Sequence, residues 1–114
     1  MDDKIVIRIR LDKTIYRRVW REAYEQAIET DKSPKGLFGS IIQKAIEYAI
    51  ENDINIDVNR EYKDTIQTSI KIPRELRKKL LEVILDKYGS KYGMLTHVIN
   101  QAIEQYLLKN EVKQ

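Results

Sequence analysis

Two stretches, one near the start of the sequence and one just past its middle, carry mostly polar side chains at every second position. The first runs from Lys4 to Leu11 and the second from Thr65 to Ile72. The side chains between their apolar positions include Val6, Arg8, Arg10, Gln67, Ser69 and Lys71. Arginine and lysine donate to guanine O6 and N7, and glutamine pairs with adenine N6 and N7, whereas valine is an odd base reader that could contact only a thymine methyl group. This set of side chains predicts contacts to the edges of DNA bases.

Catalytic and metal chemistry find little support in the same sequence. The chain has no cysteine, which excludes disulfides, thiolate catalysis and cysteine-ligated zinc. Its single histidine, His97, cannot form a metal site or a catalytic triad alone, and we expect it on the exposed side of a helix. No glycine-rich phosphate loop is present. We therefore expect no enzyme, and no catalytic residue, metal, cofactor or small-molecule substrate.

The alternation of the two stretches predicts β-strands. One face of each would be apolar, formed by Ile5, Ile7, Ile9 and Leu11 and by Ile66, Thr68, Ile70 and Ile72. A lone strand lacks partners for its backbone hydrogen bonds, and only two strands are predicted. We therefore expect Ile5–Leu11 to pair with Ile66–Ile72 as an antiparallel ribbon. Its apolar face would lie on helices, and its polar face would fit the major groove.

Each predicted strand is followed by two predicted helices. Asp12 suits a helix N-cap, and Pro73 ends the second strand and suits the first turn of a helix. Apolar residues then recur every four positions, as on a helix with one buried face. Ser33 followed by Pro34 predicts the start of a second helix, and Ser90 is its counterpart.

The two halves of the sequence resemble each other. Residues 9–15 align with residues 70–76 at an offset of 61, and residues 36–46 align with residues 93–103 at an offset of 57. We interpret this as a duplication with a short deletion. The predicted fold is mostly α, with a two-stranded antiparallel β-ribbon and two fused β-α-α units in a pseudo-twofold intramolecular dimer. The predicted units are residues 1–52 and 65–114, sharing one core and joined by a linker at 53–64.

The order strand-helix-helix resembles the ribbon-helix-helix family, the group of the Arc and methionine repressors. The resemblance rests on the alternating strand, the basic residue before the first helix, and the pattern Gly-x-x-Thr-x-x-Ile-x-x-Ala-Ile at 93–103. It covers nearly the whole chain, in a tandem form in which one chain supplies both halves. It implies a sequence-specific DNA-binding transcriptional regulator, a repressor or an activator, with the six outward positions named above as base readers.

The family also anchors phosphate at the start of the second helix, where free N–H groups favour an anion. The positions that the resemblance assigns to this role are Lys35, Gly36, Gly39, Lys91, Gly93 and Thr96. The family often has Ser-x-Ser there, whereas this chain has Leu37/Gly39 and Met94/Thr96. Only Thr96 keeps a hydroxyl, so the phosphate clamp is less well defined than the ribbon.

Composition and charge agree with this interpretation. The net charge is +3 and the pI about 9.0, a mild lean towards polyanions. Without a signal peptide or a membrane-length apolar run, we expect a cytoplasmic protein, in the host cytoplasm if it is viral. Small regulators of this fold are common in archaeal and bacterial viruses and plasmids, and abundant Ile, Lys, Glu and Tyr suggest a thermophile.

Alternatives remain open within this interpretation. One is an antitoxin, against which the short segment after the last helix argues, and another is a protein-interaction module of the same fold without base reading. The expected partner is double-stranded DNA and no membrane. Since one ribbon covers only a short subsite, the sequence also allows further copies to associate on DNA.

Overall fold

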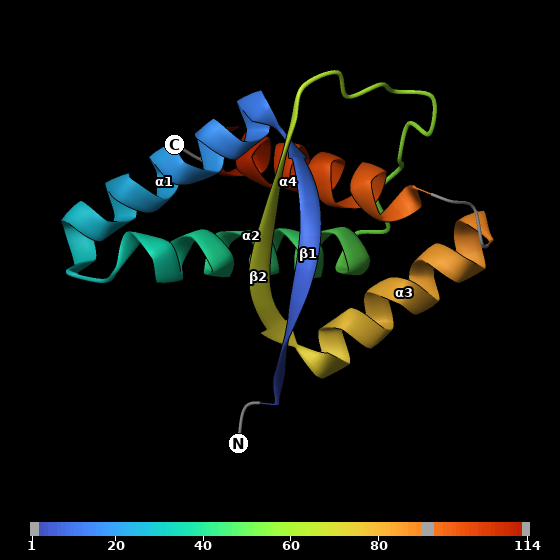
Figure 1. Ribbon diagram of the computed structural model, residues 1–114, viewed down its shortest axis with the longest axis horizontal. Coiled ribbons are helices and arrows are strands. Elements are labelled where there is room, and N and C mark those ends of the chain that lie inside the picture. The colour runs from blue at the N-terminus through green and yellow to red at the C-terminus, as the bar shows by residue number, and fades with distance from the viewer. Residues whose placement is uncertain (1–2, 90–92, 113–114) are drawn as a thin grey trace.

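A computed structural model describes residues 3–89 and 93–112, with the side chains of 111 and 112 left aside. Over these residues the structure is mostly helical, with one two-stranded antiparallel sheet and four helices, as predicted (Figure 1). In chain order the elements are β1 (Lys4–Asp12), α1 (Lys13–Thr30), α2 (Pro34–Glu51), β2 (Thr65–Pro73), α3 (Arg74–Tyr88) and α4 (Met94–Val112). None of the described helices is long and apolar enough to cross a bilayer.

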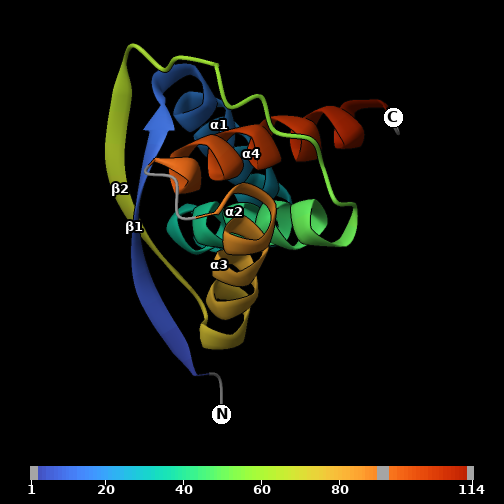
Figure 2. The same ribbon diagram turned by 90° about the vertical axis from the view of Figure 1, so that its right-hand side faces the viewer.

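The two strands pair along their whole length. Ile5 lies opposite Ile72, Arg8 opposite Ser69, and Leu11 opposite Ile66, which confirms the predicted antiparallel pairing. Both strands alternate between buried and exposed residues, because successive side chains point to opposite faces of a sheet. The ribbon therefore forms one layer of the molecule and the helices form the other (Figure 2).

One hydrophobic core lies beneath the ribbon and draws residues from all six elements. Leu11, Val19, Ile42, Ile72 and Leu80 are each at most 1% exposed within it. Helix α4 contributes Met94, Ile99 and Ile103, among others, to the same cluster. Helix α2 packs against both α1 and α4, so the two predicted halves bury their apolar faces against each other. A unit of half this length would bury much less of its surface alone.

Short-range chemistry determines where the helices begin. The Asp12 carboxylate caps α1 by accepting from the backbone N–H groups of Thr14 at 2.9 Å and Ile15 at 3.3 Å, as predicted. Pro73 ends β2 and directly precedes α3. Ser33 stands at the N-cap position of α2, but its side chain makes no capping hydrogen bond. Ser90, its predicted counterpart, lies outside the described residues.

Candidate nucleic-acid interface

The outward face of the ribbon is accessible along its whole length. Its exposed residues are Lys4, Val6, Arg8, Arg10, Gln67, Ser69 and Lys71. All six predicted base-reading side chains are therefore on the side away from the helices. Val6 is 58% exposed and is the apolar member of this otherwise polar face.

Cross-strand pairing brings the predicted readers together in three pairs. Val6 lies opposite Lys71, Arg8 opposite Ser69, and Arg10 opposite Gln67. Such opposed side chains have Cβ atoms about 4.5–5.5 Å apart. Four of the seven exposed ribbon residues are cations and none is acidic. Among the described residues, the side chains of Arg8, Arg10 and Lys71 have no hydrogen bond or ion pair, so their donors face solvent.

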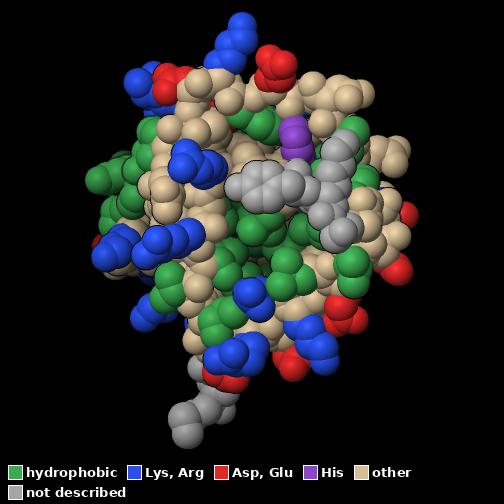
Figure 3. Space-filling view, turned by 45° about the vertical axis from the view of Figure 1, so that its right-hand side comes forward, with side chains coloured by type: hydrophobic (Ala, Val, Ile, Leu, Met, Phe, Trp, Pro, Cys, Tyr) green, Lys and Arg blue, Asp and Glu red, His purple; other side chains and the backbone are tan. Residues whose placement is uncertain are grey.

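A groove joins this face to the start of α4. Its lining includes Arg8, Arg10 and Gln67 from the ribbon and Gly93 and Thr96 from the N-terminal end of α4. The structure thus brings predicted base readers and predicted phosphate-binding residues to one surface. Figure 3 shows Lys and Arg side chains on the left of the view, on the side of the ribbon, and hydrophobic side chains towards the centre of the view.

The other predicted phosphate-binding residues divide between two places. Lys35 and Gly36 are exposed in the first turn of α2, and Gly39 is half-buried one turn later. The starts of α2 and α4 lie on opposite sides of the ribbon in Figure 1, and both are near it in Figure 2. Each end presents free backbone N–H groups and the positive end of a helix dipole. Lys91 lies outside the described residues.

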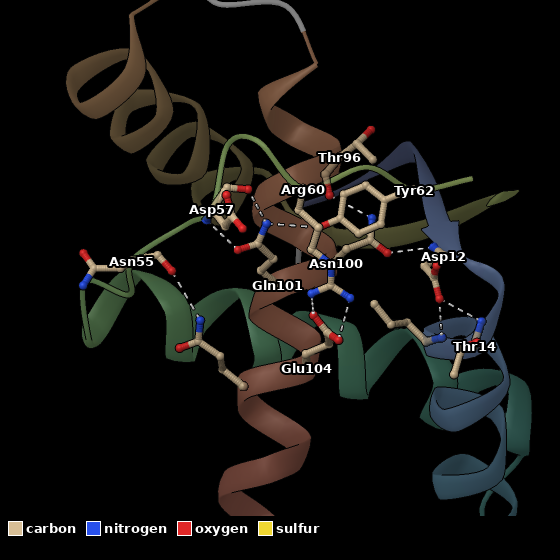
Figure 4. Close-up of polar contacts among 12 residues, drawn as sticks. Asp12, Thr14, Asn55, Asp57, Arg60, Tyr62, Thr96, Asn100, Gln101 and Glu104 are labelled. Atoms are coloured by element: carbon tan, nitrogen blue, oxygen red, sulfur yellow. Dashed lines mark hydrogen bonds and ion pairs between the residues drawn. The ribbon is translucent and has the colours of Figure 1, made fainter. Parts of the chain in front are cut away.

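The segment between α2 and β2 borders the same surface, although its sequence predicts only a linker. Ile54 is buried between Ala49 of α2 and Ala102 of α4. Further along, the guanidinium of Arg60 donates two hydrogen bonds to the carboxylate of Glu104, one of them 2.9 Å from Nη2 to Oε2 (Figure 4). The hydrogen bond to Glu104 raises the pKa of Arg60. This segment is therefore fixed onto α4 and does more than connect the two halves.

Two buried amides of α4 hold its neighbours in place. Gln101 accepts from the backbone N–H of Asp57 at 2.8 Å and donates to the carbonyl of Asp57 at 2.9 Å and the hydroxyl of Tyr62 at 3.1 Å. Asn100 bonds the backbone of β1 in a similar way. The sequence carried one signal for both residues, because two adjacent amides interrupt an apolar run at 98–103. Buried amides need hydrogen-bond partners.

His97 differs from its predicted surface position. It is half-buried, its ring lies 5.5 Å from that of Tyr62, and its Nδ1 atom is buried without a hydrogen bond among the described residues. The segment before β2 is the reason, since it brings Tyr62 across this side of α4. The helical periodicity of the sequence does not predict that Tyr62 lies against His97.

Burial raises the pKa of Tyr62, although the hydrogen bond from Gln101 acts in the opposite direction. An unfolded tyrosine titrates near pH 10, so the contribution of the neutral phenol to stability is complete below that pH. The contribution is lost as pH rises through the higher pKa of the folded state. We expect Tyr62→Phe to remove the latest step in a tyrosinate absorbance titration. Persistence of that late step in Tyr62→Phe would show that another tyrosine causes it.

The arrangement is suited to binding an anionic surface. Its cations face solvent, two helix starts flank the ribbon, and no group of three or more potential metal ligands occurs in the described part of the chain. Comparison with protein-family models, curated proteins and solved structures gives no match to the chain.

Proposed function

We propose that this protein is a sequence-specific double-stranded DNA-binding transcriptional regulator, acting as a repressor, an activator or both, that inserts its β-ribbon into the major groove. The observation that carries the proposal is the outward ribbon face, with four exposed cations, no acidic side chain and free donors. A two-stranded ribbon fits the major groove, which is about 12 Å wide. The guanidinium of Arg8 or Arg10 would contact guanine, and Gln67 would contact adenine.

The second part of the proposal is a tandem ribbon-helix-helix architecture with a pseudo-twofold axis. The offset of 61 equates Arg8 with Ser69, and these two residues are cross-strand partners. An axis through that pair would exchange the strands. The strand ends support it, because the N–H of Lys13 donates to Asp64 O and the N–H of Arg74 donates to Asp3 O, both at 2.9 Å. These four residues are equivalent in pairs at the same offset.

The proposed symmetry is broken at the reading positions. Arg10 of β1 corresponds to Lys71 of β2, Arg8 to Ser69, and Val6 to Gln67. Each half of the ribbon therefore offers different donors, acceptors and apolar groups to DNA. We propose that the ribbon reads a non-palindromic subsite. Equal affinity for the native site and for a symmetrised version of it would contradict this part of the proposal.

Salt dependence tests the DNA-binding function directly. Cations that neutralise phosphates release counterions, so affinity for a random duplex should fall as salt increases. With about five phosphates contacted, we expect log affinity against log salt to have a slope of about −4 to −5. Fluorescence anisotropy over a salt series measures it. An absent or salt-insensitive interaction would favour a protein-interaction module instead.

Selection of bound duplexes from a random pool tests sequence specificity. We expect a short preferred sequence to be enriched, with specific binding about 10³-fold or more tighter than binding to random duplex. Enrichment without any common sequence would leave a non-specific DNA-binding protein and remove the base-reading role of the ribbon.

A further inference from the structure

Asn100 is a buried polar residue at the junction of the ribbon and α4. Its side chain is 0% exposed, and all of its hydrogen bonds are to backbone groups. The Oδ1 atom accepts from the N–H of Asp12 at 2.7 Å (Figure 4). The Nδ2 atom donates to the carbonyl of Arg10 at 2.9 Å. Nδ2 also donates to the carbonyl of Thr96 at 2.8 Å. One carboxamide therefore contacts the backbone of a proposed base reader and of a proposed phosphate-binding residue.

The geometry explains why an amide occupies this position. Arg10 and Asp12 are two residues apart on β1, so their backbone groups that do not face β2 lie on the same open edge. The carboxamide of Asn100 offers that edge one acceptor and one donor on the same side, as the C=O and N–H of a single residue in a third strand would. Replacing it removes a hydrogen-bond partner from two partly buried backbone groups, and a partly buried group without a partner disfavours this placement of the strand.

We infer that Asn100 is a positioning residue, which fixes the end of β1 that carries Arg10 at a set distance from the start of α4. This inference rests on the DNA-binding function proposed above. Base contacts and phosphate contacts at this end act together only if strand and helix keep their spacing. Phosphate contacts position a protein on the duplex, and base contacts then specify the sequence.

The two hydrogen bonds from Asn100 to β1 are present at one end of the ribbon only. Their effect on DNA recognition should therefore be limited to that end. At the offset of 57, the residue of α2 that corresponds to Asn100 is Gln43, and at the offset of 61 the residue of β2 that corresponds to Asp12 is Pro73. Proline has no backbone N–H to donate, so the same pair of hydrogen bonds cannot form at the other end of the ribbon. Gln43 makes no hydrogen bond among the described residues. The structure therefore ties the Arg10 end of the ribbon more firmly than the Lys71 end.

The test compares Asn100→Ala with the matched variant Gln43→Ala in the full chain, below the unfolding temperature of both. The duplex selected by the wild-type protein is changed one base pair at a time, and the positions sensitive to Arg10→Ala and to Lys71→Ala are located first. We expect Asn100→Ala to lose about tenfold in discrimination at the Arg10-sensitive positions, within the range of one bidentate base contact. For Asn100→Ala we expect no change in discrimination at the Lys71-sensitive positions and no change in the salt slope with random duplex. For Gln43→Ala we expect the discrimination of the wild-type protein at all positions.

The outcomes separate this inference from the proposed function. If the wild-type protein shows no preference for any DNA sequence, the proposed function itself is wrong. A wild-type protein with preference, together with a folded Asn100→Ala that keeps it or loses it equally at all positions, would overturn the positioning role alone. If Asn100→Ala does not fold, Asn100→Ser takes its place, because an uncharged hydroxyl can donate or accept a hydrogen bond and does not bury a carboxylate against the carbonyls of Arg10 and Thr96. It should show a smaller loss confined to the same positions, and any other pattern would contradict the inference.

Discussion

Replacing both Arg10 and Lys71 by alanine should abolish most of the discrimination between the preferred duplex and random DNA. Each good bidentate contact to a base contributes about 1–3 kcal/mol of discrimination, so the double variant should lose about 2–6 kcal/mol. The two residues are on opposite strands and are not cross-strand partners, since Arg10 lies opposite Gln67 and Lys71 opposite Val6. Their losses should therefore add approximately. Competition binding against random duplex measures the effect.

The thermal unfolding midpoint of the same double variant shows whether the loss of discrimination comes from lost base contacts or from a destabilised fold. Both side chains are exposed and make no hydrogen bond or ion pair with a described residue, so the midpoint should be nearly unchanged. Lys44→Ala is a suitable control, because Lys44 is an exposed cation in the middle of α2. It removes one charge at a position away from the ribbon. Equal loss of discrimination in Lys44→Ala, or a large drop in the midpoint of the double variant, would contradict the base-reading role.

Ile72→Ala should destabilise the whole protein by about 2–5 kcal/mol. Ile72 is 0% exposed and lies on the inner face of β2, opposite Ile5. Truncating the Ile72 side chain leaves a cavity in a core to which all six elements contribute. We therefore expect a single cooperative unfolding transition whose midpoint is shifted to a lower urea concentration. Urea unfolding monitored by circular dichroism measures the shift.

Ser69→Ala is the matched control on the same strand. Ser69 is exposed on the opposite face of β2, and its substitution should change the free energy of unfolding by no more than about 0.5 kcal/mol. The contrast between two nearby residues depends entirely on which face of the ribbon each occupies. Similar losses for both variants would mean that the ribbon does not lie on the helices as described.

Much of the fold follows from local patterns in the sequence. Period-two alternation predicted both strands, and an apolar residue every fourth position predicted the helices, because backbone geometry alone sets these repeats. The pairing of the strands also followed, since a single strand cannot satisfy its own hydrogen bonds. The exposure of Arg8 and Arg10 was implied by the same alternation. Their role as base readers remains a proposal that the binding experiments above test.

The sequence by itself determined the strands, the helices and the face on which the ribbon carries its cations, because each depends on residues a few positions apart. Only the tertiary structure decided that the segment at 53–64 packs on α4, that His97 is covered beside Tyr62, and that Asn100 bonds β1. These contacts join residues up to 90 positions apart. No periodicity records them, because they depend on which buried donors and acceptors the packed helices bring within hydrogen-bonding distance.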